Sequence, residues 1–147
     1  MPIAQKAATV VAPKLPKMIT PTAHAVIDYA MFGAFFTAGA LLWSKNKRAS
    51  LAAYLCADIV GSLAFLTDMP GGVWKKISFE THGRIDPGLS ALAATIPEML
   101  AFKAEKEARL FQTMGIAMAV VGGLTDYAQG SKNHETRLRE TRTRVAA

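Results

Sequence analysis

The sequence predicts an all-α protein, an integral membrane four-helix bundle made of two tandem two-helix repeats. Three observations support this prediction. The chain of 147 residues contains four apolar segments, and a helix needs roughly 17–25 mostly apolar residues to cross a bilayer. The second half of the chain repeats the first at a fixed offset. Small residues recur four positions apart, a spacing that lets helices pack closely in lipid.

The four apolar segments differ in length and in polar character. They run from Ala23 to Trp43, from Ala49 to Leu66, from Gly88 to Phe102 and from Leu110 to Leu124. The first two reach the spanning length with their flanks, and the last two reach it only if their polar ends are included. The alternative is a soluble bundle, whose helices should each carry a polar face along their whole length. Because the first and fourth segments have no such face, length and hydropathy favour the membrane.

An internal repeat relates the two halves of the chain. At an offset of 58 residues His24 aligns with His82, Asp28 with Asp86, and Leu66-Thr67-Asp68 with Leu124-Thr125-Asp126. Matching polar residues at one offset are much harder to obtain by chance than matching apolar ones. Each half reads as helix, short basic loop, helix, so the chain returns to the same membrane side. The halves are therefore predicted to be parallel repeats, related by a pseudo-two-fold axis along the membrane normal.

The repeat sets the domain organisation. The predicted segments are a basic, Pro-containing N-terminal tail at 1–19, a first two-helix repeat at 20–69, an interfacial connector at 70–77, a second two-helix repeat at 78–127 and a basic C-terminal tail at 128–147. The connector carries Trp74 beside Lys75 and Lys76, which is typical of a membrane interface; a lid over the polar residues is the alternative. The N-terminal tail has no apolar stretch that indicates a cleaved leader.

A cluster of polar residues is predicted at one membrane face. Because the first helix of each half starts where the second one ends, the duplicated residues should gather there. The candidate ligand or ion cluster consists of His24, Asp28, Asp68, His82, Asp86 and Asp126, joined by Thr67 and Thr125. Each His lies four residues before an Asp, on the same side of its helix. Since Pro87 suits a first turn, Asp86 is predicted to cap the third helix, with His82 in the preceding loop.

Several roles for this cluster remain open. It could be structural, with Asp residues capping helices and His–Asp hydrogen bonds tying the halves together. Two His with several carboxylates also suit a divalent transition metal, with His24 and His82 as candidate ligands. The same two His could be axial ligands of a non-covalent haem, or the cluster could carry protons. No cofactor is identified by the sequence.

One acid lies within an apolar segment. Asp58 is near the midpoint of the second predicted helix, and its repeat partner is Ile116. A charge at that depth is costly and usually faces the bundle interior. Asp58 is therefore an intramembrane functional candidate, and the alternative is a protonated carboxyl hydrogen-bonded to Ser62, Tyr54 or a neighbouring helix.

Charge indicates the partners and the orientation. The net charge is +6 and lies largely in the tails, which are expected to be solvated and attracted to anionic lipid. The basic tail lacks interleaved aromatic residues and a folded module, so no nucleic acid is expected. The excess of Lys and Arg on the side of the termini favours cytoplasmic termini. With Cys56 as the single cysteine, no intrachain disulfide can form.

Two short motifs carry a resemblance. Thr81-His-Gly-Arg-Ile-Asp86 and Leu124-Thr-Asp-Tyr127 resemble those of uncharacterised small bacterial four-helix membrane proteins with duplicated hairpins. From Thr20 to Tyr127 the architecture is also similar to that of the SPW-repeat family, although the chain has no Ser-Pro-Trp motif. The resemblance implies a multi-pass protein of the bacterial inner membrane and implies no activity.

The sequence favours a non-enzymatic function. It contains no nucleotide-binding glycine loop, nucleophile elbow or metalloprotease motif. The first hypothesis is an accessory or structural subunit of a larger membrane complex, bound to other subunits or to copies of itself. The rival hypothesis is a metal-, haem- or proton-handling membrane protein that uses the His/Asp cluster.

Overall fold

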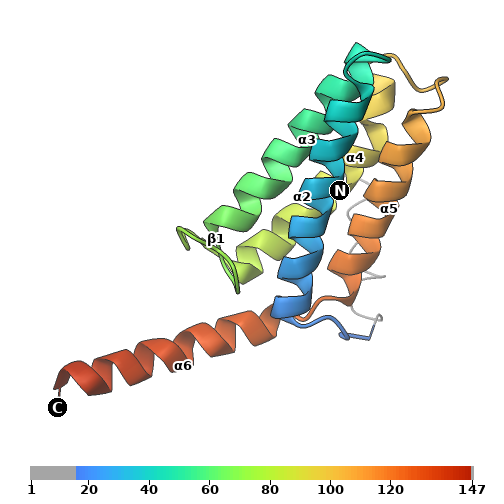
Figure 1. Ribbon diagram of the computed structural model, residues 1–147. Helices are drawn as coiled ribbons and strands as arrows, with labels where there is room; N and C mark the ends of the chain where they lie inside the picture. Colours follow the sequence, from blue (N-terminus) through green and yellow to red (C-terminus); the bar gives the residue numbers. More distant parts are fainter. Residues whose placement is uncertain (1–15, 147) are drawn as a thin grey trace.

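Four long helices lie side by side in the computed structural model, which describes residues 16–146 (Figure 1). In chain order they are α2 (Pro21–Leu42), α3 (Lys47–Leu66), α4 (Phe79–Met99) and α5 (Ala108–Leu124). A further helix, α6 (Tyr127–Ala146), projects away from one end of them. Two short parallel strands, β1 (Thr67–Asp68) and β2 (Ile77–Ser78), lie at that same end. The predicted all-α class is thus confirmed.

The first helix of each half begins with the same local device. The Thr20 hydroxyl accepts a hydrogen bond from the Ala23 amide at 3.2 Å, and Pro21 occupies the first turn of α2. The Ser78 hydroxyl accepts one from the Thr81 amide at 3.1 Å at the start of α4. Both are N-caps that satisfy an otherwise free helix N–H. They occupy equivalent positions in the repeat, so α2 and α4 start in register.

Packing is closest within each half, where α2 packs along α3 and α4 along α5. A side-chain carbon at Gly39 of α2 would come 2.9 Å from the Tyr54 ring of α3. A side-chain carbon at Gly115 of α5 would come 2.7 Å from the Ser90 carbonyl oxygen of α4. Real carbon atoms do not approach so closely, so these glycines allow the helices of each hairpin to meet.

The two halves are joined by exchanged backbone pairing. Thr67, at the end of the first half, pairs with Ile77 at the start of the second. Ile19, at the start of the first half, forms a parallel bridge with Thr125 at the end of the second. These two pairs are related by the offset of the repeat. The start of each half is therefore held by the end of the other.

One predicted helix boundary is wrong. The third helix begins at Phe79, so His82 and Asp86 both lie inside α4 rather than in a loop and at a cap. Ser78 supplies the cap instead, and Pro87 is accommodated within the helix. The proline leaves the Gly83 carbonyl without its helical N–H donor.

The basic C-terminal segment is helical, whereas the sequence predicted only a solvated tail. The Asp126 carboxylate accepts a hydrogen bond from the Gln129 amide at 3.2 Å at the start of α6. Along α6, Glu135 precedes Arg139 and Glu140 precedes Arg144 by four residues, a spacing that supports a helix. The predicted N-terminal tail lies outside the described residues, except for positions 16–19.

Two helices, α2 and α3, are long and apolar enough to cross a membrane, and α5 is a shorter apolar helix. Only 17% of the apolar window of α2 is buried, against 56% for α3. Large apolar side chains lie exposed on these helices, among them Val26, Phe36, Leu41, Leu51, Leu55, Ile116 and Val120. Two such helices are weak evidence for a membrane, since a core helix or a signal sequence meets the same criterion.

Candidate metal centre

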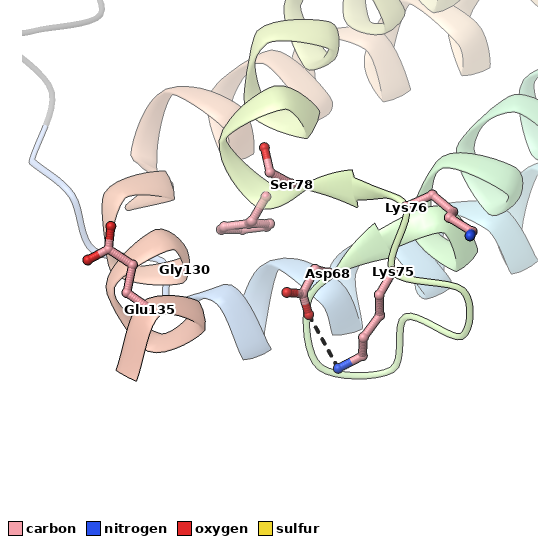
Figure 2. Close-up of a pocket in the computed structure, with 7 residues that line it drawn as sticks. Asp68, Lys75, Lys76, Ser78, Gly130 and Glu135 are labelled. Carbon is pink, nitrogen blue, oxygen red and sulfur yellow. Dashed lines mark ion pairs between the residues drawn. The ribbon is translucent and has the colours of Figure 1, made fainter. Parts of the chain in front are cut away.

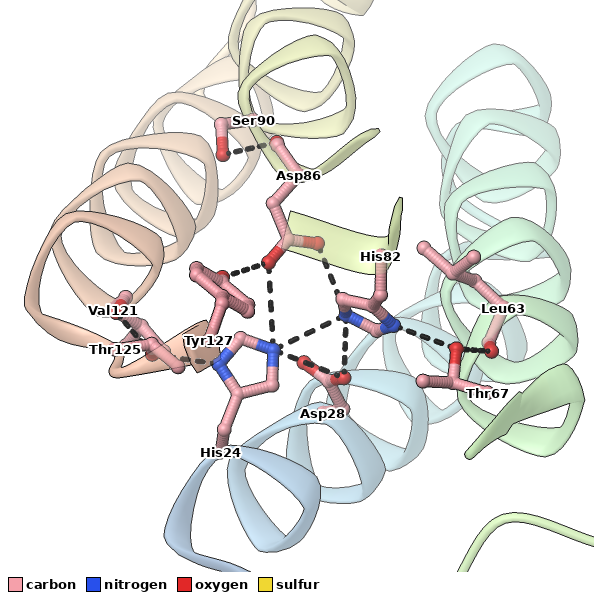
Figure 3. Close-up of polar contacts among 10 residues, drawn as sticks. All are labelled: His24, Asp28, Leu63, Thr67, His82, Asp86, Ser90, Val121, Thr125 and Tyr127. Carbon is pink, nitrogen blue, oxygen red and sulfur yellow. Dashed lines mark hydrogen bonds and ion pairs between the residues drawn. The ribbon is translucent and has the colours of Figure 1, made fainter. Parts of the chain in front are cut away.

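Two histidines meet at the end of the molecule from which α6 departs (Figure 3). His24 lies in the first turns of α2 and His82 in the first turns of α4, and each is only 1% exposed. Their Nε2 atoms are 3.1 Å apart. The repeat thus brings its two equivalent imidazoles into direct contact.

Two carboxylates close around the imidazole pair. Asp28 Oδ2 lies 3.4 Å from His24 Nε2 and 3.2 Å from His82 Nε2. Asp86 approaches His24 Nε2 with Oδ2 at 3.4 Å and His82 Nε2 with Oδ1 at 3.1 Å. Each Asp is therefore placed one turn after the His of its own helix and also opposite the His of the other half.

Two threonines fix which imidazole nitrogen faces the centre. The Thr67 hydroxyl donates its hydrogen to the Leu63 carbonyl at 2.6 Å, so it can only accept from His82 Nδ1, which lies 2.8 Å away. Thr125 has the same role in the other half. Its hydroxyl donates to the Val121 carbonyl at 2.7 Å and accepts from His24 Nδ1 at 2.8 Å. This network places a hydrogen on both Nδ1 atoms. The Nε2 atoms then turn their lone pairs towards the carboxylates.

The centre of the cluster is consequently surrounded by electron-pair donors. The Oδ2 atom of Asp28 is buried, and as long as both Nε2 atoms carry lone pairs it receives no hydrogen bond from the described residues. A buried carboxylate oxygen without a donor is costly. The arrangement calls for a positive charge at the point where the four side chains converge.

In the absence of an ion, a proton can supply part of that charge. Burial by itself would lower the pKa of His82, but hydrogen bonds to Asp28 and Asp86 and the charges of both carboxylates raise it to about 9. A proton on His82 Nε2 is shared well with only one or two acceptors. A metal ion can bond to at least three of these groups at once, namely His24, His82 and Asp86.

The spacing of the groups suits a small metal ion: His24, His82 and Asp86 each offer one ligand atom, and these three atoms lie within 4.8 Å of one another. Zn–N and Zn–O bonds of about 2.0–2.2 Å place neighbouring ligand atoms about 3.3–3.6 Å apart in a tetrahedron. The nitrogen–nitrogen and nitrogen–oxygen distances here are 3.1–3.4 Å. Two carboxylates also balance the charge of a divalent ion. A haem does not fit between the imidazoles, because its plane would have to pass between nitrogens 3.1 Å apart.

Tyr127, at the start of α6, covers the cluster. Its hydroxyl donates a hydrogen bond to Asp86 Oδ2, and burial together with the negative charge of Asp86 raises the pKa of Tyr127, so the hydroxyl keeps its proton. Its ring lies 4.9 Å from that of Phe79 and 5.4 Å from that of His24. A side-chain carbon at Gly83 would come 2.6 Å from the Tyr127 ring. Only glycine therefore admits the tyrosine there.

The sequence did not indicate Tyr127 as a site residue. Its repeat partner is Met69, so a comparison of the halves has no reason to select it. One feature of the sequence does point to Tyr127. It directly follows Leu124-Thr125-Asp126, the motif that supplies Thr125 to the cluster.

Two residues of the predicted cluster lie at the same end of the molecule but outside the centre. Asp68 pairs with Lys75 at 3.3 Å, beside a surface pocket of about 330 Å³ that Phe79 and Glu135 also line (Figure 2). Asp126 caps α6. Both follow the threonines directly, and it is the threonine of each Thr-Asp pair that reaches the histidines.

The sequence predicts that Asp58 faces the interior of the bundle. The structure contradicts this, because Asp58 is exposed near the middle of α3. Up to Asp58, the buried face of α3 consists of small side chains, namely Ala49, Ser50, Ala52, Ala53, Cys56 and Ala57. These residues let α3 approach its neighbours closely and leave the carboxyl on the opposite side.

No protein-family model matches the chain, and neither a curated protein nor a solved structure matches it. The resemblance to small bacterial membrane proteins therefore stays a prediction. Function must be inferred from the site itself.

Proposed function

We propose that the chain is a small bacterial inner-membrane protein whose duplicated His/Asp centre binds one divalent transition metal ion, with Zn²⁺ the best fit. The observation that carries this proposal is the pair of Nε2 atoms 3.1 Å apart, with an oxygen of Asp28 and an oxygen of Asp86 within 3.1–3.4 Å of each. The ion would bond α2 to α4 and so fasten one half of the duplicated bundle to the other.

The donor set favours a structural ion over a catalytic one. Catalytic zinc keeps one position open for water or substrate, whereas structural zinc has four protein ligands. Here His24, His82 and Asp86 form a buried set of three possible ligands. Asp28 lies 3.2–3.4 Å from both imidazoles and is a possible fourth ligand, and Tyr127 covers the cluster. Thr67 and Thr125 hold the imidazole orientation, as groups hydrogen-bonded to metal ligands commonly do. This supports a non-enzymatic role.

The membrane part of the proposal is supported by the exposed apolar surface. Phe36 is 54% exposed on α2, Leu51 is 56% exposed on α3, and Ile116 is 65% exposed on α5. Lipid would cover side chains that water solvates poorly. The metal centre would then lie at one membrane face, beside the basic α6, and the excess of Lys and Arg there supports cytoplasmic termini.

The metal proposal is tested on the full-length chain purified in detergent. Metal analysis should find one divalent ion per chain, and Co²⁺ added to the metal-free protein should give the strong visible absorption of tetrahedral cobalt. The double variant His24→Gln with His82→Gln should lose both signals. Asp126→Asn is the matched control, since it alters a neighbouring carboxylate outside the centre and asparagine can still cap α6.

Two results would overturn the proposal. Folded wild-type protein that binds neither Zn²⁺ nor Co²⁺ stoichiometrically would remove the metal function. A chain that is monodisperse in water without detergent would remove the membrane location.

An accessory role in a larger membrane complex is the second candidate, and a surface groove favours it. The groove lies between α2 and the start of α5 and has a volume of about 660 Å³. It is lined mainly by small and apolar residues, including Gly33, Ala34, Ala38, Leu41 and Leu110. Such a surface suits a transmembrane helix of another subunit. Affinity purification from native membranes should then recover a fixed partner that Gly33→Leu displaces, and recovery of the same set of proteins with both forms would contradict this role.

A further inference from the structure

A pocket of about 330 Å³ opens beside the His/Asp centre, at the end of the molecule where α6 begins (Figure 2). This volume lies in the range of about 300–1,000 Å³ that is typical of small-ligand sites. Phe79 lines the pocket, and its ring also packs against the rings of His24 and His82. A side-chain carbon at Gly130 of α6 would come 2.6 Å from the Phe79 ring, so α6 closes directly onto this side chain. The pocket and the centre share no polar residue.

Backbone hydrogen bonds build one wall of the pocket. Asp68 of β1 is in register with Ser78 of β2 in the short parallel sheet, and both residues line the pocket. The connector between the two strands is tied to the end of α3, because the amides of Trp74 and Lys76 donate to carbonyls there at 3.0 and 2.7 Å. The pocket is therefore already formed without a ligand.

The pocket carries charges of both signs. The Lys75 ammonium lies 3.3 Å from a carboxylate oxygen of Asp68. Glu135 stands on α6, on the opposite side of the pocket from Lys75 (Figure 2). Lys76 also lines the pocket, but its ammonium points away from it (Figure 2). Lys75 has a φ of 46°, a conformation that a residue other than glycine seldom adopts and that is often found at functional sites.

The same connector presents apolar side chains to the outside. Val73 is 61% exposed and Trp74 is 68% exposed, directly before Lys75 and Lys76. An aromatic ring beside cations is typical of the headgroup region of a bilayer. Tyr127, rather than the connector, covers the His/Asp centre, which favours the interfacial interpretation of the connector over that of a lid. In a membrane this position would put the pocket at the depth of the lipid headgroups.

We infer that this pocket binds the phosphoethanolamine headgroup of a zwitterionic membrane lipid. The inference rests on the membrane part of the proposed function. The ammonium group of the lipid would donate hydrogen bonds to Asp68 and Glu135, and its phosphate would accept one from Lys75. Hydrogen bonds between charged groups are the strong ones.

The charges of the pocket also define which headgroups it rejects. A trimethylammonium headgroup has no N–H to donate to Asp68 and Glu135. An anionic glycerol headgroup would place a net negative charge beside the same two carboxylates, and like charges repel. The pocket is thus expected to select a primary ammonium joined to a phosphate, whereas the basic tail attracts anionic lipid in general.

The test mixes full-length, metal-loaded protein in detergent with equal amounts of phosphatidylethanolamine, phosphatidylcholine and phosphatidylglycerol of the same chain length. Native mass spectrometry then counts the lipids that stay bound. Phosphatidylethanolamine should be retained roughly tenfold over the other two, the effect of one hydrogen bond to a charged group. Lys75→Gln and Glu135→Gln should each remove this preference. The matched controls Lys76→Gln and Glu140→Gln should keep it, since the Lys76 ammonium points away from the pocket and Glu140 does not line it.

Soluble glycerophosphoethanolamine distinguishes the source of the headgroup, because it carries the same phosphate and ammonium without acyl chains. It should displace the lipid only at concentrations far above that of the lipid. Displacement at equal concentration would assign the pocket to a soluble ligand and overturn the inference.

The remaining outcomes separate this inference from the proposed function. Metal-loaded wild-type protein that retains the three lipids equally would overturn the inference alone, as would Lys75→Gln and Glu135→Gln variants that keep the preference. The metal content of the same samples reports independently on the His/Asp centre. A chain that is monodisperse in water without detergent would overturn both the membrane location and the lipid site.

Discussion

Replacing Thr67 by valine should weaken metal binding without touching a metal ligand. Valine has nearly the shape of threonine but cannot accept the hydrogen of His82 Nδ1, which lies 2.8 Å from the hydroxyl. A buried N–H left without an acceptor costs roughly 1–3 kcal/mol of stability. Loss of a group that orients a metal ligand typically weakens affinity roughly 10–100-fold. Because Thr125 holds His24 in the same way, Thr125→Val should give an effect of similar size.

The assay is competition between the protein and a chelator of known affinity, followed through the visible absorption of bound Co²⁺. Thr95→Val provides the matched control. The Thr95 hydroxyl also donates to a carbonyl four residues earlier, at 2.7 Å, but it is exposed and bonds to no histidine. An affinity that is unchanged in Thr67→Val, with stability lowered equally in Thr67→Val and Thr95→Val, would refute the assigned role of the threonines.

Three further results are expected. Tyr127→Phe keeps the ring over the centre but loses the hydrogen bond to Asp86. Transfer of the metal from this variant to a chelator should therefore be about tenfold faster than from the wild type. Equal transfer rates in the two proteins would assign the tyrosine to packing alone. The pKa of His82 in the metal-free site is raised to about 9. Below that pH, His82 must release a proton when a metal ion binds. The apparent Co²⁺ affinity should therefore fall about tenfold per pH unit from pH 9 downwards. A flat titration would contradict this. Gly115→Ala should lower the midpoint of thermal unfolding, since its new carbon would lie 2.7 Å from backbone atoms of α4, whereas Gly33→Ala meets nothing within 4 Å and should be neutral or stabilising.

The repeat made the core of the site predictable. His24, His82, Asp28 and Asp86 were selected because they match at one offset, and a pseudo-two-fold axis brings equivalent residues together wherever they lie near it. The spacing of four residues then placed each His and Asp on one side of a helix. Both inferences depend only on symmetry and helix geometry, and the four side chains do converge.

The positions of three other acidic residues depend on tertiary packing, which the sequence pattern does not reveal. Asp68 and Asp126 match as well as the histidines do, but the helices end at Thr67 and Thr125, and the two carboxylates pair with Lys75 and cap α6 instead. Asp58 was expected inside because acids in apolar helices usually are. The small residues on the opposite face of α3 decided otherwise, since they determine which side of the helix meets its neighbours.

The exchanged pairing of the halves determines what an ion bound at the His/Asp cluster would do for the fold. The threonine that orients His82 belongs to the first half, and the one that orients His24 belongs to the second. The backbone pairs Thr67–Ile77 and Ile19–Thr125 cross between halves in the same sense. Neither half therefore orients its own imidazole alone, and an ion at the cluster would take ligands from both halves. An ion that binds only the joined form stabilises it by about 4 kcal/mol at a thousandfold excess over its dissociation constant. Such an ion would crosslink the duplicated hairpins at the end of the molecule where α6 begins.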